Sequence, residues 1–251
     1  HGSQNPFLSH IFLSGLEKHL CLRERWGWAS SPVTLFDNGE LIAAAPAYIK
    51  TNSHGEFVFD HAWAHAYART GRDYYPKLIV ATPYTPVTGP RLLSKNSAAR
   101  EKLILQLEQK ALEENLSSVH INFLPESEAS VTPDYWLERC DVQFHWQNNA
   151  GWKSFDDFLA ALNRKKRKNI QQERNQVLKA GISLRCISGH EASDDDVSAM
   201  YGFYCATQLE KGNHPALTLE FLRYLNREMP ANVVIFLAEK NGQAIAGAYC
   251  L

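Results

Sequence analysis

Hydrophobic and β-favouring residues flank an Asn-Gly pair at two places in the chain. The first stretch runs from Val33 to Ile49 with Asn38-Gly39 in its middle, and the second runs from Asn232 to Leu251 with Asn241-Gly242. An Asn-Gly pair favours a type I′ turn, because both central residues of that turn need positive φ. Each stretch therefore predicts a β-hairpin.

A predicted helix precedes each hairpin. The residues from Phe12 read FLSGLEK and those from Phe221 read FLRYLNR, with apolar positions at helical spacing in both. When the two turns are aligned, Ile42 matches Ile245. We interpret this as a distant internal duplication of one α/β unit. The alternative is chance similarity, because Asn-Gly hairpins and amphipathic helices are common.

The other apolar runs predict further helices and strands. Helical spacing predicts helices over residues 7–20, 60–69, 97–115, 134–140, 154–162, 164–180, 193–211 and 217–229. Asp60, Ser154 and Ser193 are the expected N-caps of three of them. Apolar runs predict strands over residues 57–59, 78–82, 118–124, 142–147 and 182–187. Strands that alternate with helices, together with the hairpins, predict an α/β fold with mixed sheets.

The stretch Asn148–Trp152 is the expected boundary between two domains, residues 4–150 and 151–251. The chain stops at Leu251 inside an apolar strand. We therefore expect the natural molecule to be longer and the second unit to be incomplete at its C-terminus. The strand Ala244–Leu251 would then expose unpaired N–H and C=O groups, so we expect that edge to pair with further chain or with a second molecule.

Composition bounds the class of protein. The 251 residues are 45% hydrophobic and carry a formal net charge of −1, which suits packed globular domains. No run is long and apolar enough to span a bilayer, and the five cysteines form no CxxC pair, so we expect a cytoplasmic protein without a disulfide framework or zinc site. The chain lacks GxSxG, P-loop, GxGxxG and HExxH motifs, which argues against the enzyme classes that use them. His1-Gly2-Ser3 resembles the remnant of a tag.

Positive charge is concentrated in one predicted helix. Residues 164–179 hold seven Lys or Arg and one acid, Glu173, which gives a local charge of +6 and leaves −7 for the rest of the chain. Such a patch attracts the phosphates of a nucleotide-linked precursor, of coenzyme A or of a tRNA. Arg167 and Lys168 are our binding candidates here. The alternatives are a solvated helix face and a nucleic-acid binder that acts through this helix.

Four segments resemble one known family. They are Gly55–Arg69 (GEFVFDHAWAHAYAR), Tyr74–Leu93 (YYPKLIVATPYTPVTGPRLL), Gln143–Asn148 (QFHWQN) and Phe155–Arg174 (FDDFLAALNRKKRKNIQQER). Together they resemble the bacterial Fem-like family, whose members are labelled peptidoglycan biosynthesis/recognition proteins within the GNAT (Gcn5-related acyltransferase) superfamily. The resemblance covers essentially the whole chain after the first residues. One departure is His61, where the family usually has a Trp.

The resemblance implies two tandem GNAT-like units. It also implies an N-acyltransferase that acts on an amine of a cell-wall precursor or related metabolite, with acyl-CoA or aminoacyl-tRNA as donor. From the residues themselves we expect no metal. A GNAT unit holds the donor pyrophosphate in the loop after its central strand, here Thr82–Arg91. This loop lacks the Q/R-x-x-G-x-G/A signature and is rich in proline, which has no N–H to donate. We therefore expect a rigid substrate wall, with a stiff structural loop as the alternative. Its candidate contacts are Tyr84, Thr85, Thr88 and Arg91.

Other polar residues give weaker signals. His61 and His65 lie four residues apart on a predicted helix, a metal-like spacing without an evident third ligand. The run Asp194–Asp196 follows a cap residue and suits a helix N-terminus better than a metal. His120 and His145 fall inside predicted strands and are expected as hydrogen-bonded core or cleft residues. No phenol stands out as a general acid among Tyr84, Tyr201, Tyr204 and Tyr249, so no catalytic residue is assigned.

Three hypotheses for function follow. The first is the GNAT/Fem-type acyl or aminoacyl transferase. The second is a GNAT scaffold that binds a phosphorylated or peptidoglycan-like ligand without turnover, and the third is a nucleic-acid binder acting through helix 164–179. Because ligands commonly lie where domains meet, we also expect Arg91, Arg167 and Lys168 to border one electropositive cleft.

Overall fold

The computed structural model describes residues 5–251, so the expected tag remnant at residues 1–3 lies outside the described part. The helices are α1 His10–Lys18, α2 His61–Arg69, α3 Ser97–Glu113, α4 Glu126–Ala129, α5 Phe155–Ala161, α6 Arg164–Lys179, α7 Asp194–Glu210 and α8 Leu219–Glu228. The strands are β1 Trp28–Ser30, β2 Val33–Asp37, β3 Glu40–Ala45, β4 Ala47–Lys50, β5 Lys77–Val80, β6 Leu93–Ser94, β7 Val119–Ile121, β8 Ile182–Ser188, β9 Val234–Lys240 and β10 Gln243–Cys250. Short 3-10 turns occur at Pro6–Leu8, Glu24–Trp26 and Pro230–Asn232.

Both predicted hairpins are confirmed. Strands β2 and β3 turn at Asn38 and Gly39, whose φ angles are 48° and 82°, and strands β9 and β10 turn at Asn241 and Gly242, with 54° and 75°. The left-handed region at both central positions is the geometry that a type I′ turn requires. Local sequence chemistry therefore determines both turns.

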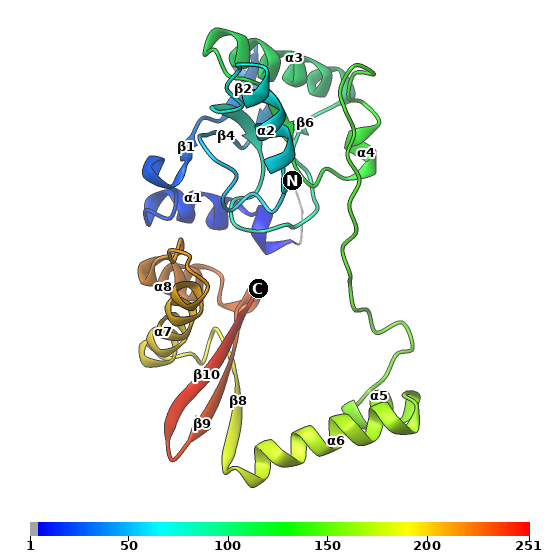
Figure 1. Ribbon diagram of the computed structural model, residues 1–251, viewed down its shortest axis with the longest axis vertical. Helices are drawn as coiled ribbons and strands as arrows, with labels where there is room; N and C mark the ends of the chain where they lie inside the picture. The colour runs from blue at the N-terminus through cyan, green and yellow to red at the C-terminus, as the bar shows by residue number, and fades with distance from the viewer. Residues whose placement is uncertain (1–4) are drawn as a thin grey trace.

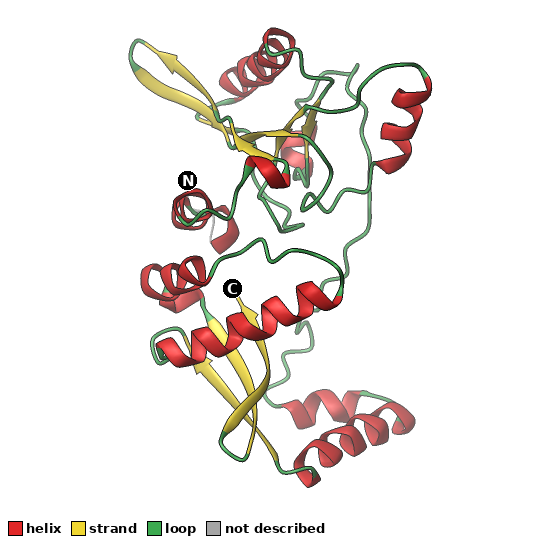
Figure 2. Ribbon diagram, turned by 60° about the vertical axis from the view of Figure 1, so that its left-hand side comes forward, coloured by secondary structure: helices red, strands yellow, loops and turns green. Residues whose placement is uncertain are grey.

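The strands form three sheets in two groups, which Figures 1 and 2 show at opposite ends of the molecule. The sheet β1-β4-β5-β7 is antiparallel except for the parallel pair β5 and β7, and the sheet β2-β3-β6 lies beside it. Helix α3 packs on both through Leu103, Ile104 and Leu107, which are fully buried among residues of β3, β4 and β5. The expected α/β fold with mixed sheets is confirmed.

The third sheet, β8-β9-β10, builds its core with helices from both ends of the chain. Helix α7 covers one face of the sheet, and α8 packs on α7. Helix α1 packs in turn on α8, where Phe12 and Phe221 meet edge to face with ring centroids 5.5 Å apart. Residues near the N-terminus thus complete a core whose other members come after residue 186.

Several expected elements differ in the structure. Residues 57–59 form no strand, because Phe57 has a φ of 59° and the flanking Glu56 and Asp60 both bond to the buried Lys77. Residues 134–140 are not helical, because Trp136 and Tyr135 bond to Glu108 of α3 through tertiary contacts that a local pattern does not reveal. Residues 142–147 form no strand, and Phe144 is 98% exposed.

Helices α5 and α6 project away from the rest of the structure. Figure 1 shows a long connection without helix or strand leading down to α5, and α6 then leads into β8. Among the described residues β10 has β9 as its only strand neighbour, so it is an edge strand, and its pairing with another chain stays a prediction.

No helix in residues 5–251 is both long enough and apolar enough to cross a membrane.

The contact between α1 and α8 gives a stability prediction. A Cβ added at Gly15 would lie 2.6 Å from a ring carbon of Tyr224 and 3.0 Å from Phe221. We expect Gly15→Ala to lower the unfolding free energy by roughly 1–3 kcal/mol in urea denaturation, because overpacking outweighs the gain in helix propensity. Gly202 of α7 is the matched control, since no heavy atom lies within 4 Å of its added Cβ. Gly202→Ala should stabilise by up to about 1 kcal/mol, and equal effects of the two changes would contradict this packing.

Candidate functional site

The guanidinium of Arg91 donates hydrogen bonds to backbone carbonyls of its own loop. It is fully buried, and its Nη1 donates to the carbonyl of Gly89 at 2.9 Å while its Nη2 donates to that of Val87. The Glu128 carboxylate accepts from the backbone N–H of Arg91 at 2.8 Å and of Leu92 at 3.0 Å. Burial lowers the pKa of the guanidinium to about 10. Arg91 therefore stiffens loop 82–91 and leaves no charge facing solvent.

Tyr84 joins two cores rather than lining an open surface. Its hydroxyl donates to the carbonyl of Cys21 at 2.9 Å, and its ring packs 5.4 Å from Trp28. Its backbone N–H donates to the carbonyl of Gly55, where any Cβ would lie 2.7 Å from the tyrosine ring. Thr85 is partly buried and Thr88 is exposed. The assignment of these residues to substrate binding stays a prediction.

Helix α6 carries its positive charge into solvent. None of its seven cations forms an ion pair with a residue of the described chain, and Lys165 and Lys168 are exposed. Arg167 is partly buried and donates to the carbonyl of Leu162 at 3.4 Å, across the junction with α5. Figure 1 places α6 at the far end of the long axis from β6, which follows Arg91. The structure therefore does not form the single cleft that we expected Arg91, Arg167 and Lys168 to share.

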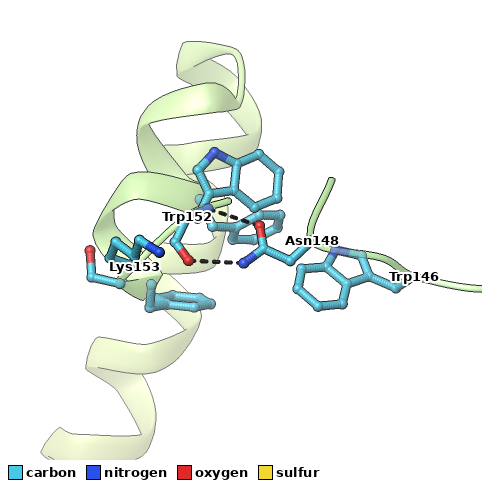
Figure 3. A pocket seen from close by; sticks show the side chains of 7 residues that line it. Trp146, Asn148, Trp152 and Lys153 are labelled. Atoms are coloured by element: carbon cyan, nitrogen blue, oxygen red, sulfur yellow. Dashed lines mark hydrogen bonds between the residues drawn. The ribbon is translucent and has the colours of Figure 1, made fainter. Parts of the chain in front are cut away.

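An aromatic pocket of about 530 Å³ lies at the start of α5, next to α6. Figure 3 shows its lining, which consists of Trp146, Asn148, Trp152, Lys153, Ser154, Phe155 and Phe158. Asn148 closes the turn by accepting from the N–H of Trp152 at 2.9 Å and donating to its carbonyl at 2.8 Å. The predicted capping box of Ser154 and Asp157 is present and fixes the first turn of α5. Arg174 of α6 lies 4.4 Å from the ring centroid of Phe155.

A buried ionic cluster around Lys77 was missed by the sequence pattern. Lys77 Nζ donates to Glu56 Oε2 at 2.9 Å and to Asp60, and all three side chains are at most 3% exposed. Asp60 also accepts from the hydroxyls of Ser53 and Tyr74. It therefore holds Lys77 instead of capping α2, whose first turn has no side-chain cap. These bonds turn segment 53–60 inward onto β5.

Two buried lysines lie side by side in this cluster, and their mutual repulsion affects the pKa values of its members. Lys50 and Lys77 are opposite partners on the antiparallel strands β4 and β5, and both are fully buried. Burial lowers the pKa of Lys50 to about 7, with the charge of Glu56 opposing and that of Lys77 adding to the shift. Burial raises the pKa of Glu56, against the attraction of Lys77. For Asp60, burial raises the pKa but the hydrogen bonds, led by that from Lys77, outweigh it and lower the pKa to about 2.

His120 borders the same cluster. Its Nε2 lies 2.9 Å from the hydroxyl of Ser118 and 3.5 Å from that of Tyr74. Burial, followed by the charge of Lys77, lowers its pKa to about 4, so the imidazole is neutral near pH 7. The expectation of a hydrogen-bonded histidine is confirmed here, whereas His145 is exposed and lies outside any strand.

The acidic run at the start of α7 serves the fold. Asp196 forms a capping box with Ser193 and accepts from Arg185, and Asp194 pairs with Arg223 at 2.6 Å. Within residues 5–251, no group of three or more His, Cys, Asp or Glu side chains is arranged to hold a metal ion. The aromatic pocket and the cations of α6 remain open to a ligand, whereas the charge of Arg91 and the hydroxyl of Tyr84 in loop 82–91 are bonded within the protein.

The sequence model of the family described as FemAB-like, peptidoglycan biosynthesis/recognition, matches residues 1–251, the whole chain. No curated protein matches the chain.

The Lys77 cluster gives a prediction about stability. Lys77→Met should leave Glu56 and Asp60 buried without the cation that donates hydrogen bonds to both, and cost about 3–5 kcal/mol of unfolding free energy. The matched control is Lys95→Met, because Lys95 pairs with Glu40 while both side chains are about half exposed or more. We expect that change to cost less than about 1 kcal/mol. Chemical denaturation of both variants measures the difference, and similar losses would contradict the larger cost expected for leaving buried carboxylates without Lys77.

The depressed pKa of His120 gives a pH prediction. Its folded pKa of about 4 lies below the ordinary value of about 6.5, so the unfolded chain binds the proton more readily. Stability should therefore fall as pH drops from about 6.5 to 4.5, by on the order of 2 kcal/mol from this residue. His120→Gln should lack that part of the decline in urea denaturation at each pH. Asp60 contributes little between about pH 6.5 and 4.5, because both its folded pKa of about 2 and its ordinary value of 3.8 lie below that window. Glu56, whose pKa is raised by burial, is present in parent and variant alike, so the comparison of the two profiles isolates His120. Parallel pH profiles for parent and variant would overturn the assignment.

Proposed function

This chain belongs to the FemAB-like family of peptidoglycan biosynthesis and recognition, and on that basis we propose that it transfers an acyl or aminoacyl group to an amine of a cell-wall precursor. In such a transfer the amine nitrogen attacks the donor carbonyl, a new N–C bond forms, and the C–S bond of the thioester or the C–O bond of the ribose ester breaks. The leaving thiolate or ribose oxygen takes up the proton that the amine loses. We propose acyl-CoA or aminoacyl-tRNA as the donor, and two tandem GNAT-like units as the scaffold.

The observation that carries this proposal is the placement of charge on α6. Five consecutive cations, residues 164–168, occupy the first turns of the helix. The N-terminal end of a helix already bears partial positive charge, so cations there are unfavourable. Arg164 and Lys168 also form a like-charge pair at i, i+4. This placement of cations lowers the stability of α6. A bound anion would offset that loss by neutralising the repulsion.

The anions that both proposed donors share are phosphates. Acyl-CoA carries them in its nucleotide part, and tRNA carries one for each nucleotide. Exposed lysines on a projecting helix can reach such a backbone without displacing any protein partner, because they have no ion pair to break within the described chain. We therefore assign α6 to donor binding, and within it Lys165 and Lys168 as the exposed contacts, with Arg167 supporting the junction to α5.

A second candidate function is ligand recognition without turnover. It is favoured by the loop 82–91, where the charge of Arg91 and the hydroxyl of Tyr84 are both already bonded within the protein. In this case the same cations would bind a phosphorylated cell-wall precursor, and no acyl group would be transferred.

Charge reversal on α6 tests the proposed function. Lys165→Glu/Lys168→Glu should weaken binding of aminoacyl-tRNA or acyl-CoA by at least about tenfold, because phosphate contacts are charge-assisted. It should also make tRNA binding less sensitive to salt, with the logarithmic salt slope falling by about 1 for each phosphate that the variant no longer neutralises. Lys102→Glu/Lys240→Glu is the control with the same charge change at exposed sites on α3 and β9. Binding is measured by equilibrium titration at several salt concentrations.

Transfer itself is measured as a labelled acyl or aminoacyl group appearing on an amine acceptor. Donor binding without label transfer would favour the recognition function. If no member of a panel of acyl-CoAs and aminoacyl-tRNAs binds, or if both double variants behave alike, the assignment of α6 to donor binding is wrong.

A further inference from the structure

Helix α2 and the residues that precede it, together segment 55–72, hold large aromatic side chains outside the core. No residue of α2 is buried, although the helix contains Trp63, which is 50% exposed. Just before the helix, Phe57 is 48% exposed and Phe59 is 73% exposed. Phe59 adjoins the N-cap and Trp63 lies in the first turn, so these two rings belong to the same end of the helix. Exposed aromatic side chains that gather in this way mark a surface that meets another apolar phase.

The buried ionic cluster fixes these rings in their exposed position. Glu56 and Asp60 are the only carboxylates of segment 55–72, and both accept from the buried Lys77. Phe57 and Phe59 lie between these two anchors in the sequence and face solvent. The segment therefore turns its acids inward and its aromatic side chains outward.

The exposed ionisable groups of this segment are all basic. His61, His65, Arg69 and Arg72 are exposed, and none forms an ion pair or a side-chain hydrogen bond within the described chain. The first exposed acid after them is Asp73. Aromatic side chains and unpaired basic groups thus share one short surface segment, which suits a partner that is both apolar and anionic.

A recess of about 560 Å³ lies along α2 between two of the basic residues. Its lining consists of Ala62, His65, Ala68 and Arg69, all of them on this helix. Because alanine side chains are short, the recess leaves space beside the imidazole and the guanidinium. A phosphate group that enters this space can accept charge-assisted hydrogen bonds from Arg69.

A second part of the chain extends the same surface. Arg139 Nη1 donates to the carbonyl of Phe59 at 3.3 Å, which brings this cation to the aromatic end of α2. Leu137, two residues earlier, is 84% exposed. Between them Glu138 accepts from the thiol of Cys140. Exposed apolar side chains and cations from two separate segments therefore meet near Phe59.

We propose that segment 55–72 binds the surface of an anionic lipid bilayer. The rings of Phe57, Phe59 and Trp63 enter the interfacial layer, where amphipathic helices place such side chains. Arg69 and Arg72 contact the phosphates of the headgroups, whose negative charge attracts basic segments. At nine residues α2 is too short to span a bilayer, so it lies in the plane of the interface. This inference is independent of the proposed function, because it concerns α2 and not α6.

Sedimentation with unilamellar vesicles tests the proposal. Vesicles that contain phosphatidylglycerol and phosphatidylcholine in equal parts are compared with vesicles of phosphatidylcholine alone, at low and at high salt. We expect the partition coefficient at low salt to be at least about tenfold higher on the anionic vesicles, and the difference to shrink at high salt because salt screens the charge contacts. Soluble glycerophosphate should not displace the protein, because it offers no apolar layer for the aromatic rings.

One pair of variants tests the aromatic contacts. Phe59→Ser/Trp63→Ser should lower the partition coefficient on anionic vesicles by at least about tenfold, because two large apolar side chains no longer leave water. The matched control is Phe36→Ser/Leu41→Ser, since these side chains are 64% and 48% exposed on the β2-β3 hairpin. The control should bind as the parent does, and thermal unfolding of each variant verifies that the fold is retained.

A second pair tests the charge contacts and the location of the surface. Arg69→Glu/Arg72→Glu should remove the preference for anionic vesicles. Lys165→Glu/Lys168→Glu makes the same change of charge on α6 and should keep that preference.

Three results would overturn the proposal. The parent protein could fail to sediment with anionic vesicles, or glycerophosphate could displace it, which would identify a site for free phosphate instead of a lipid surface. The α6 variant could lose vesicle binding while both α2 variants retain it, which would place the contact on α6.

Discussion

The packing of α1 on α8 is the contact on which the arrangement of this molecule depends. It joins residues 10–18 to residues 219–228, so the core under the β8-β9-β10 sheet includes the start of the chain. Gly15 permits the close approach, and Phe12 and Leu16 fill the space between the helices. Tyr84 and Leu22 contact both this core and the cluster around Trp28, and they thereby link the two groups of strands.

The charged side chains around Lys77 are buried and paired, whereas the cations of α6 form no ion pair within the described chain. Around Lys77 the lysines and carboxylates are buried and paired, because an isolated charge in that environment would be strongly unfavourable. On α6 the cations have no ion-pair partner in the described chain, and their position at the helix N-terminus opposes the stability of the helix. The first arrangement fixes a fold, whereas the second is suited to a partner that brings negative charge. This contrast is why we assign function to α6 and structure to the Lys77 cluster.

Several residues show where the sequence was sufficient for the candidate site and where it was not. The cationic helix and the capping box of α5 are confirmed because both depend on neighbours within one or two turns. Arg91 looked like a ligand contact, but its guanidinium bonds to carbonyls of its own loop. Asp60 looked like a helix cap, but it bonds to Lys77, seventeen residues away. A lysine at the start of an otherwise apolar buried strand was the one available signal for that cluster.

The sequence by itself determined the two Asn-Gly hairpins, the helix boundaries set by Ser154, Ser193 and Gly181, and the α/β class, since each follows from local backbone preference or periodicity. Only the tertiary structure decided which buried charges pair, and it alone brought α1 onto α8 and Trp146 opposite Trp152. It also left residues 142–147 without a partner strand among the described residues. Those outcomes depend on contacts between residues distant in the chain or on side-chain orientation in a loop. Neither leaves a periodic pattern that a single sequence can reveal.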